Sequence, residues 1–257
     1  DTGSRGLGDV YKRQIETDAY TITIAAGDAE VTATDLTALY GKTSVAVDAS
    51  AVTQITGTVA EANIVYAAGS SEITGLGNEI VVTTESSLTD VTALNTLDGN
   101  TTGTVNTATI TSITGTLAKL LTAYGSNGIT GLGNEAITVS DTTSLAASDL
   151  NSLDSKTSGT VTTSTSLATL TGTVAELNTA YGSSGLSIEG DEAITISDTT
   201  VDAEALNVLN NYTSGVINAD TLTKLTGTLV DVNVAFAADA PASGATISGL
   251  GDQDVEL

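Results

Sequence analysis

The fold is decided by the stretch LTGTVAELNTAYG at Leu170–Gly182, which recurs along the chain with its pattern intact. Its opening tetrapeptide, Ile/Leu-Thr-Gly-Thr, starts at four places with spacings of 58, 57 and 55 residues, namely Ile55, Ile113, Leu170 and Leu225. Repetition at a nearly constant period is typical of proteins in which each unit packs on its neighbours. The sequence therefore predicts tandem units of about 57 residues.

The same stretch predicts a helix over Thr171–Gly182. Leu170, Val174, Leu177 and Tyr181 are separated by steps of four, three and four residues, so they share one face of a helix. Thr173 and Glu176 have the spacing of a capping box, as do Thr58 and Glu61 in the first copy of the motif.

A second strand–helix half precedes this helix in each unit. Glu135–Thr142 (EAITVSDT) alternates apolar and polar residues, as a half-buried strand does. We expect a short helix after it, ended by Gly159 in a positive-φ conformation, and then a second strand over Gly159–Ser166. The N-cap candidates of this helix in the other units are Thr32, Asp90 and Asp202, whereas Ala146 cannot cap.

A glycine-rich marker opens each half-unit of this kind. It reads ITGLGNE at Ile73–Glu79 and Ile129–Glu135, LSIEGDE at Leu186–Glu192, and ISGLGDQ at Ile247–Gln253. It lacks the lysine of a phosphate-binding loop, so we interpret it as a backbone turn before a strand.

These elements predict an α/β repeat solenoid with parallel strands stacked along its length and short helices on the flank. The expected units are residues 19–72, 73–128, 129–185 and 186–244, with a partial fifth at 245–257. Each unit is expected to contain two strand–helix halves of about 28 residues.

The first fourteen residues, Asp1–Gln14, do not match the repeat. Ser4–Gln14 (SRGLGDVYKRQ) resembles the in-frame translation of a sequencing-library adaptor, which implies a metagenomic origin and a non-native, disordered segment. The repeat array would then be residues 15–257. Because it starts and stops within a unit, we expect it to be a fragment of a longer protein.

Composition excludes several classes of protein. The chain has 257 residues, 7 Lys+Arg, 31 Asp+Glu and no His, for a formal net charge of −24. Such an acidic chain is unsuited to nucleic acid or anionic membranes, and no apolar run is long enough to span a membrane. The 40% of hydrophobic residues argue against disorder, and the absence of Cys excludes disulfides and thiolate metal sites.

No enzyme site is recognisable. A nucleophilic triad usually needs His as its base, and zinc sites draw on His and Cys, so we expect neither catalytic nor cofactor-binding residues. Calcium is the most plausible ligand, and its weak candidate donors are Asn134, Glu135, Asp141, Asp191 and Glu192. The chain lacks both the calcium nonapeptide and the EF-hand loop, so turn chemistry and solubility explain these acids more simply.

Aromatic residues recur at one helical position, occupied by Tyr66, Tyr124, Tyr181 and Phe236. They could form a strip for stacking on sugars. Their phase with Leu and Val favours burial in the core instead.

The motifs at Ile129–Thr142, Leu150–Val161 and Thr171–Gly185 resemble tandem repeats of very large secreted or cell-surface proteins of marine cyanobacteria. This resemblance implies an adhesin-like or haemolysin-type exoprotein that is secreted or held at the cell surface. Its missing calcium nonapeptide is the departure from that group.

We therefore expect a non-catalytic structural or adhesive segment of a large extracellular bacterial surface protein. Its partners would be neighbouring repeats of the same polypeptide, with cell-surface glycans or proteins as further candidates. One alternative is a phage tail-fibre repeat, since LNTLDGNTTG (Leu94–Gly103) also resembles repeats of marine phage fibres. Another alternative is a calcium-dependent exoprotein module.

Overall fold

The computed structural model describes residues 19–239 and 246–257, and the expectation for Asp1–Gln14 lies outside them. The described residues form two compact units. Unit 1 contains the described residues up to Glu85 together with Ala93–Thr109 and Asn127–Gly131. Unit 2 contains Ser86–Thr92, Ile110–Ser126 and the described residues from Leu132 onward.

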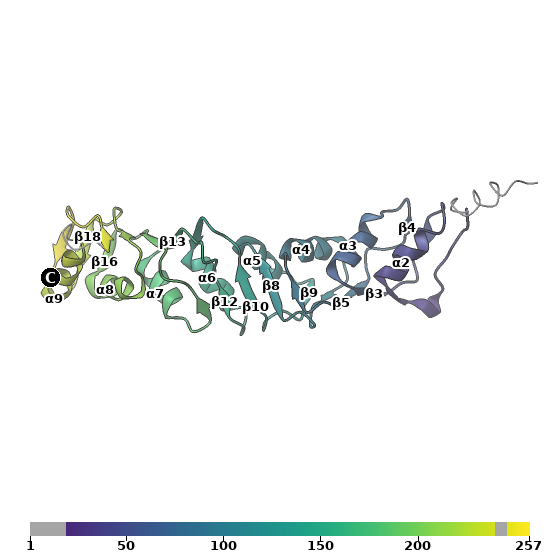
Figure 1. Cartoon of the computed structure of the whole chain (residues 1–257), viewed down its shortest axis with the longest axis horizontal. Coiled ribbons are helices and arrows are strands. Elements are labelled where there is room, and N and C mark those ends of the chain that lie inside the picture. The colour runs from purple at the N-terminus through teal and green to yellow at the C-terminus, as the bar shows by residue number, and fades with distance from the viewer. Residues whose placement is uncertain (1–18, 240–245) are drawn as a thin grey trace, which may run out of the picture. The chain divides into compact units, whose positions relative to one another are not determined.

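Helices and strands alternate along both units (Figure 1). Unit 1 has the 3-10 turn η1 (Ala26–Asp28), β1 (Glu30–Thr32), α2 (Ala33–Tyr40), β2 (Val47–Asp48), β3 (Gln54–Gly57), α3 (Val59–Ala67), β4 (Ile73–Thr74), β5 (Ile80–Thr83), β7 (Val105–Asn106) and β9 (Ile129–Thr130). Helix α4 (Val91–Asn100) has its first two residues in unit 2 and the rest in unit 1.

Unit 2 has a longer run of the same kinds of element. They are β6 (Ser87–Leu88), β8 (Ser112–Gly115), α5 (Leu117–Gly125), β10 (Ala136–Val139), β11 (Ser144–Ala146), α6 (Ala147–Asp154), β12 (Val161–Thr162), β13 (Thr169–Gly172), α7 (Val174–Gly182), β14 (Leu186–Ser187), β15 (Ala193–Ile196), β16 (Thr200–Asp202), α8 (Ala203–Tyr212), β17 (Ile217–Asn218), β18 (Lys224–Thr226), α9 (Leu229–Ala238), β19 (Ile247–Ser248) and β20 (Asp254–Glu256).

Within the described residues all strand pairings are parallel, as expected for alternating strands and helices. Unit 1 holds sheets of order β1-β3-β5-β7-β9 and β2-β4. Unit 2 holds sheets of order β14-β12-β10-β8-β6, β11-β13-β15-β17-β19 and β16-β18-β20. The chain is therefore an α/β fold of repeating strand–helix elements with parallel sheets.

The pairing register differs from the sequence repeat. Thr169 pairs with Ala193, 24 residues later, whereas α7 and α8 begin 29 residues apart, at Val174 and Ala203. Because the strand step is shorter than the helix step, each sheet shifts along the chain relative to the helices. The sheet of β11 begins with strands that precede α6 and α7, and it ends with β17 and β19, which follow α8 and α9.

The local predictions are partly confirmed. The predicted strand Glu135–Thr142 contains β10, and the predicted helix Thr171–Gly182 contains α7, which starts at Val174. The expected second strand shrinks to β12, and residues 129–185 hold additional short strands beyond the two expected in each unit. These strands span two or three residues, which is too short to show a period-2 pattern.

Helix caps follow the sequence closely. Thr58 and Thr173 form complete capping boxes with Glu61 and Glu176. The side chains of Thr32 and Asp202 cap their helices, Asp90 accepts a hydrogen bond from Thr92 N, and Ala146 makes no side-chain cap. These interactions span three residues or fewer, so local sequence is enough to specify them.

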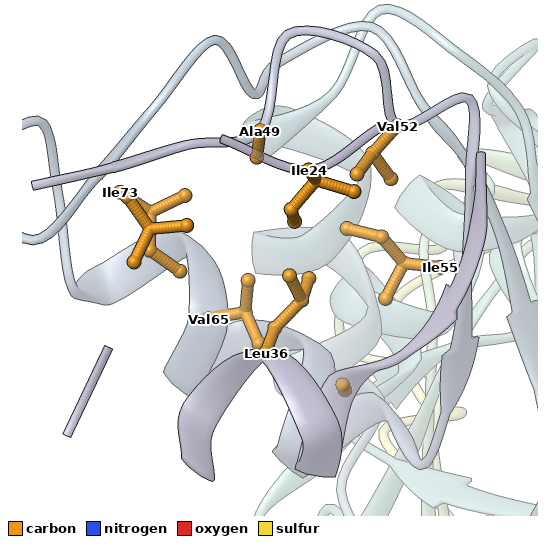
Figure 2. Packing of buried hydrophobic residues seen from close by; sticks show 9 residues of the cluster. Ile24, Leu36, Ala49, Val52, Ile55, Val65 and Ile73 are labelled. Carbon is orange, nitrogen blue, oxygen red and sulfur yellow. The ribbon is translucent and has the colours of Figure 1, made fainter. Parts of the chain in front are cut away.

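The core consists of small aliphatic side chains from both strands and helices. In unit 1, Ile24, Leu36 of α2, Ile55 of β3 and Val65 of α3 are buried and point toward a common interior (Figure 2). Adjacent helices also contact each other, as α2 does α3, and α5 to α9 do in succession. Burial of each helix face therefore depends on the next helix, as expected for a chain with few aromatics.

Candidate functional site

The glutamates of the glycine-rich marker are buried, which sequence reasoning missed. Glu79 and Glu135 are 0% exposed and Glu192 is 3% exposed. Each carboxylate folds back onto its own turn, where it accepts a hydrogen bond from the backbone N–H of a positive-φ glycine. The donor–acceptor distances are 2.8 Å from Gly77 to Glu79, 2.8 Å from Gly133 to Glu135 and 3.1 Å from Gly190 to Glu192. The positive φ explains why glycine stands at this place in the marker.

A tyrosine from the preceding helix completes each of these sites. Tyr66 OH donates to Glu79 Oε2 at 2.9 Å, Tyr124 OH donates to Glu135 Oε2 at 2.7 Å, and Tyr181 OH donates to Glu192 Oε1. Burial, followed by the adjacent carboxylate, raises the pKa of each of these tyrosines well above its usual value. The phenols are therefore neutral donors to a carboxylate over the physiological pH range. We call each Tyr–Glu–Gly arrangement a glutamate anchor.

The aromatic residues are thus neither a sugar-binding strip nor simple core residues in the described structure. Tyr66, Tyr124 and Tyr181 are half-buried, and their hydroxyl groups are engaged by the glutamates. In addition, Tyr181 stacks on Tyr212 with ring centroids 5.8 Å apart.

The last copy of the marker changes both partners of the anchor. Phe236 stands where the other copies have tyrosine, and Gln253 stands where they have glutamate. Gln253 Oε1 still accepts from Gly251 N at 2.7 Å, while its Nε2 donates to Leu222 O and Gly249 O. The loss of the phenol donor therefore coincides with the loss of the negative charge. This paired exchange is the signal in the sequence that could have revealed the anchors.

Each glutamate anchor also contacts the next coil through its backbone. Thr101, Thr157 and Thr213 donate their hydroxyls to the carbonyls of Glu79, Glu135 and Glu192 and accept a hydrogen bond from a glycine two residues later. These glycines lie so close to the carbonyls that a Cβ on Gly159 would be 1.9 Å from Glu135 O.

The expected role of Gly159 as a positive-φ helix end is therefore wrong. Helix α6 ends at Asp154, and Gly159 does not have a positive φ. Glycine is required there because the backbone of the next coil passes over the anchor.

A second group of acids caps helices across coils. Glu85 Oε1 accepts from Val59 N at 2.8 Å, Asp141 Oδ2 from Leu117 N at 2.7 Å, and Asp198 Oδ2 from Val174 N at 2.8 Å. Each of these N–H groups belongs to the first residue of a helix, where carboxylates interact favourably with the helix dipole.

The calcium candidates take different places in this arrangement. Glu135 and Glu192 lie in anchors, Asn134 donates its backbone N–H to Glu135, Asp141 caps α5, and Asp191 is exposed. In residues 19–239 and 246–257, no group of three or more His, Cys, Asp or Glu side chains is arranged to hold a metal ion. The structure thus brings Asn134 and Glu135 together but gives their contacts to the protein backbone and to Tyr124.

An open hollow of about 350 Å³ lies at the first coil of unit 1. It is lined by Ile22, Thr23, Ile24, Ala25, Asp28, Val31, Asp35, Leu36 and Leu39. Its walls are mainly aliphatic, with two carboxylates at the rim.

None of the helices in the described part of the chain combines the length and apolarity that membrane crossing requires. Comparison with protein-family models, with curated proteins and with solved structures finds no match to this chain.

Proposed function

We propose that the chain is a solenoid segment that acts as a non-catalytic structural spacer in a large extracellular bacterial surface protein. The observation that carries this proposal is that the recurring polar residues join one coil to the next. In the anchor of Glu135, Tyr124 holds the side chain, and Thr157 and Gly159 engage its backbone carbonyl. A catalytic group would instead be specific to one unit and open to substrate.

The acid distribution supports the same proposal. Glu85, Asp141 and Asp198 recur at one place in successive units and cap the helix of the preceding coil. Neighbouring repeats are therefore the partners that these side chains serve. A surface or secreted location is proposed from the resemblance of the repeats and from the acidic, Cys-free composition.

Mechanical unfolding of single molecules tests the spacer role. Because stability in a stacked array is a sum of unit and neighbour terms, the chain should extend in several steps. One repeat of about 57 residues would release about 200 Å when fully extended. A single step that releases the whole array at once would contradict the proposal.

Thermal unfolding with calcium and then with a chelator separates this proposal from the calcium-dependent alternative. The midpoint should be unchanged, because Glu135 and Asp141 are already engaged by backbone N–H groups. A rise in the midpoint with calcium would favour the calcium-dependent module instead.

A further inference from the structure

Helix α9 exposes positions that are buried in every preceding helix of the described chain. Its first residue, Leu229, is 60% exposed. The equivalent first residues are at most 4% exposed, namely Ala33, Val59, Val91, Leu117, Ala147, Val174 and Ala203. Val230 and Val234 of α9 are 70% and 51% exposed. This apolar surface, which we call the α9 face, consists of Leu229, Val230, Asn233 and Val234.

The internal repeats show what covers this position elsewhere. Helices α3, α5 and α7 come at the same place in the repeat as α9, and an acid from the following coil accepts a hydrogen bond from their first N–H group. Among the described residues no acid does so for Leu229. The α9 face therefore suits a coil that brings a carboxylate to the helix N-terminus and apolar atoms to Leu229.

Asparagines give the second requirement. Asn151, Asn178 and Asn207 donate their side-chain amides to the carbonyls of Glu176, Ala205 and Asp231, each the third residue of the next helix. Asn233 is the equivalent residue of α9 and is exposed. An incoming helix would thus offer the carbonyl of its third residue to Asn233.

We propose that the α9 face binds the first coil of a second copy of this chain, so that copies associate head to tail. That coil contains α2, whose third residue is Asp35, and the open aliphatic hollow of unit 1. In the joined pair Leu229 enters the hollow beside Val31, Asp28 of the second copy reaches the N-terminus of α9, and Asn233 donates to the Asp35 carbonyl. The pairing rests on the proposed stacking of coils but goes beyond it.

One strand must yield at this junction. Ile22–Ile24 precede α2 in the same order in which β20 would precede a further helix, and Thr23 bridges Asp48 as a parallel strand residue. Ile24 is 8% exposed, whereas all residues of β20 are exposed. We therefore assign β20 as the strand that leaves the edge of β18, where the Lys224–Glu256 ion pair holds it in the single copy.

A contact between two different faces does not close on itself, so association should continue beyond the dimer. The net charge of −24 opposes it, so added salt should strengthen it. In sedimentation velocity, the average mass of the full chain should rise with concentration and rise further at higher salt. A chain that stays monomeric under all these conditions overturns the proposal and leaves the spacer role, which mechanical unfolding tests, intact.

Variants locate the contact. Leu229→Asp should weaken association by about tenfold or more, because it places a charge in the hollow. Ile64→Asp is the matched control, since Ile64 is 52% exposed on α3 and lies outside both faces. Val31→Asp should act like Leu229→Asp, with circular dichroism confirming that each variant is folded.

Mixing the variants distinguishes head-to-tail from symmetric association. Leu229→Asp retains an intact first coil, and Val31→Asp retains an intact α9 face, so the mixture should form dimers that grow no further. Two variants that remain monomeric when mixed, or that associate as strongly as the unaltered chain when alone, would overturn the proposal.

Discussion

The glutamate anchor predicts that the effect of Glu135→Gln reverses in sign with the residue at position 124. In the natural chain Glu135 Oε2 accepts from Tyr124 OH at 2.7 Å and from the N–H groups of Gly133 and Asn134 at 2.8 and 3.1 Å. Glu135 Oε1 is buried without a hydrogen-bond partner in the described structure. The carboxylate therefore depends on the phenol for much of its compensation.

The magnitudes follow from the bonds that each change removes. Tyr124→Phe removes a charge-assisted hydrogen bond and should lower the free energy of unfolding by about 2 kcal/mol. Glu135→Gln in the natural chain weakens the same bond and should cost about 1 kcal/mol. In the Tyr124→Phe background, Glu135→Gln removes a buried charge that has lost its partner, and it should restore about 1 kcal/mol. The double variant reproduces the natural Phe236–Gln253 pair.

A double-mutant cycle measures this coupling, which we expect to be about 2 kcal/mol. Urea unfolding gives the global free energies, and hydrogen exchange at the Gly133 amide reports the anchor itself, which matters because repeat arrays can unfold in parts. Tyr20→Phe is the control, since Tyr20 is 59% exposed, and it should change stability by less than about 0.5 kcal/mol. Equal destabilisation by Glu135→Gln in both backgrounds would refute the reasoning.

Three further outcomes are expected. Gly159→Ala should cost about 3 kcal/mol in urea unfolding because its Cβ would be 1.9 Å from Glu135 O, whereas Gly99→Ala, with open space around its Cβ inside α4, should stabilise by about 0.5 kcal/mol; equal effects would contradict the close approach. Asp198→Asn should cost about 1 kcal/mol and speed hydrogen exchange at Val174 N, and unchanged exchange there would show that the cap is not formed. The pKa of Tyr181 is raised by burial and then by Glu192, so the folded state holds this proton more tightly than the unfolded state. Stability should therefore be fully present below the unfolded pKa of about 10 and fall above it, by at most about 1.4 kcal/mol per pH unit for each anchor tyrosine, and Tyr181→Phe should reduce that slope in alkaline titrations.

The sequence by itself determined the local features of this protein. The repeat of Ile55, Ile113, Leu170 and Leu225 predicted tandem α/β units, and the Thr173–Glu176 capping box predicted where α7 begins. Such features depend on hydrogen bonds and apolar steps within a few residues, so they can be read from adjacent positions.

Only the tertiary structure decided how the coils fit together. Thr169 pairs with Ala193 and not with a residue one helix step away, because the short strands slide past the helices until their apolar residues meet. Gly159 is a place of close backbone approach, and Glu135 is a buried anchor and not a solvated acid, because the groups that contact them are Glu135 O for the first and Tyr124 for the second. Those contacts join segments more than ten residues apart, and a carboxylate is buried only where folding brings its donors to it.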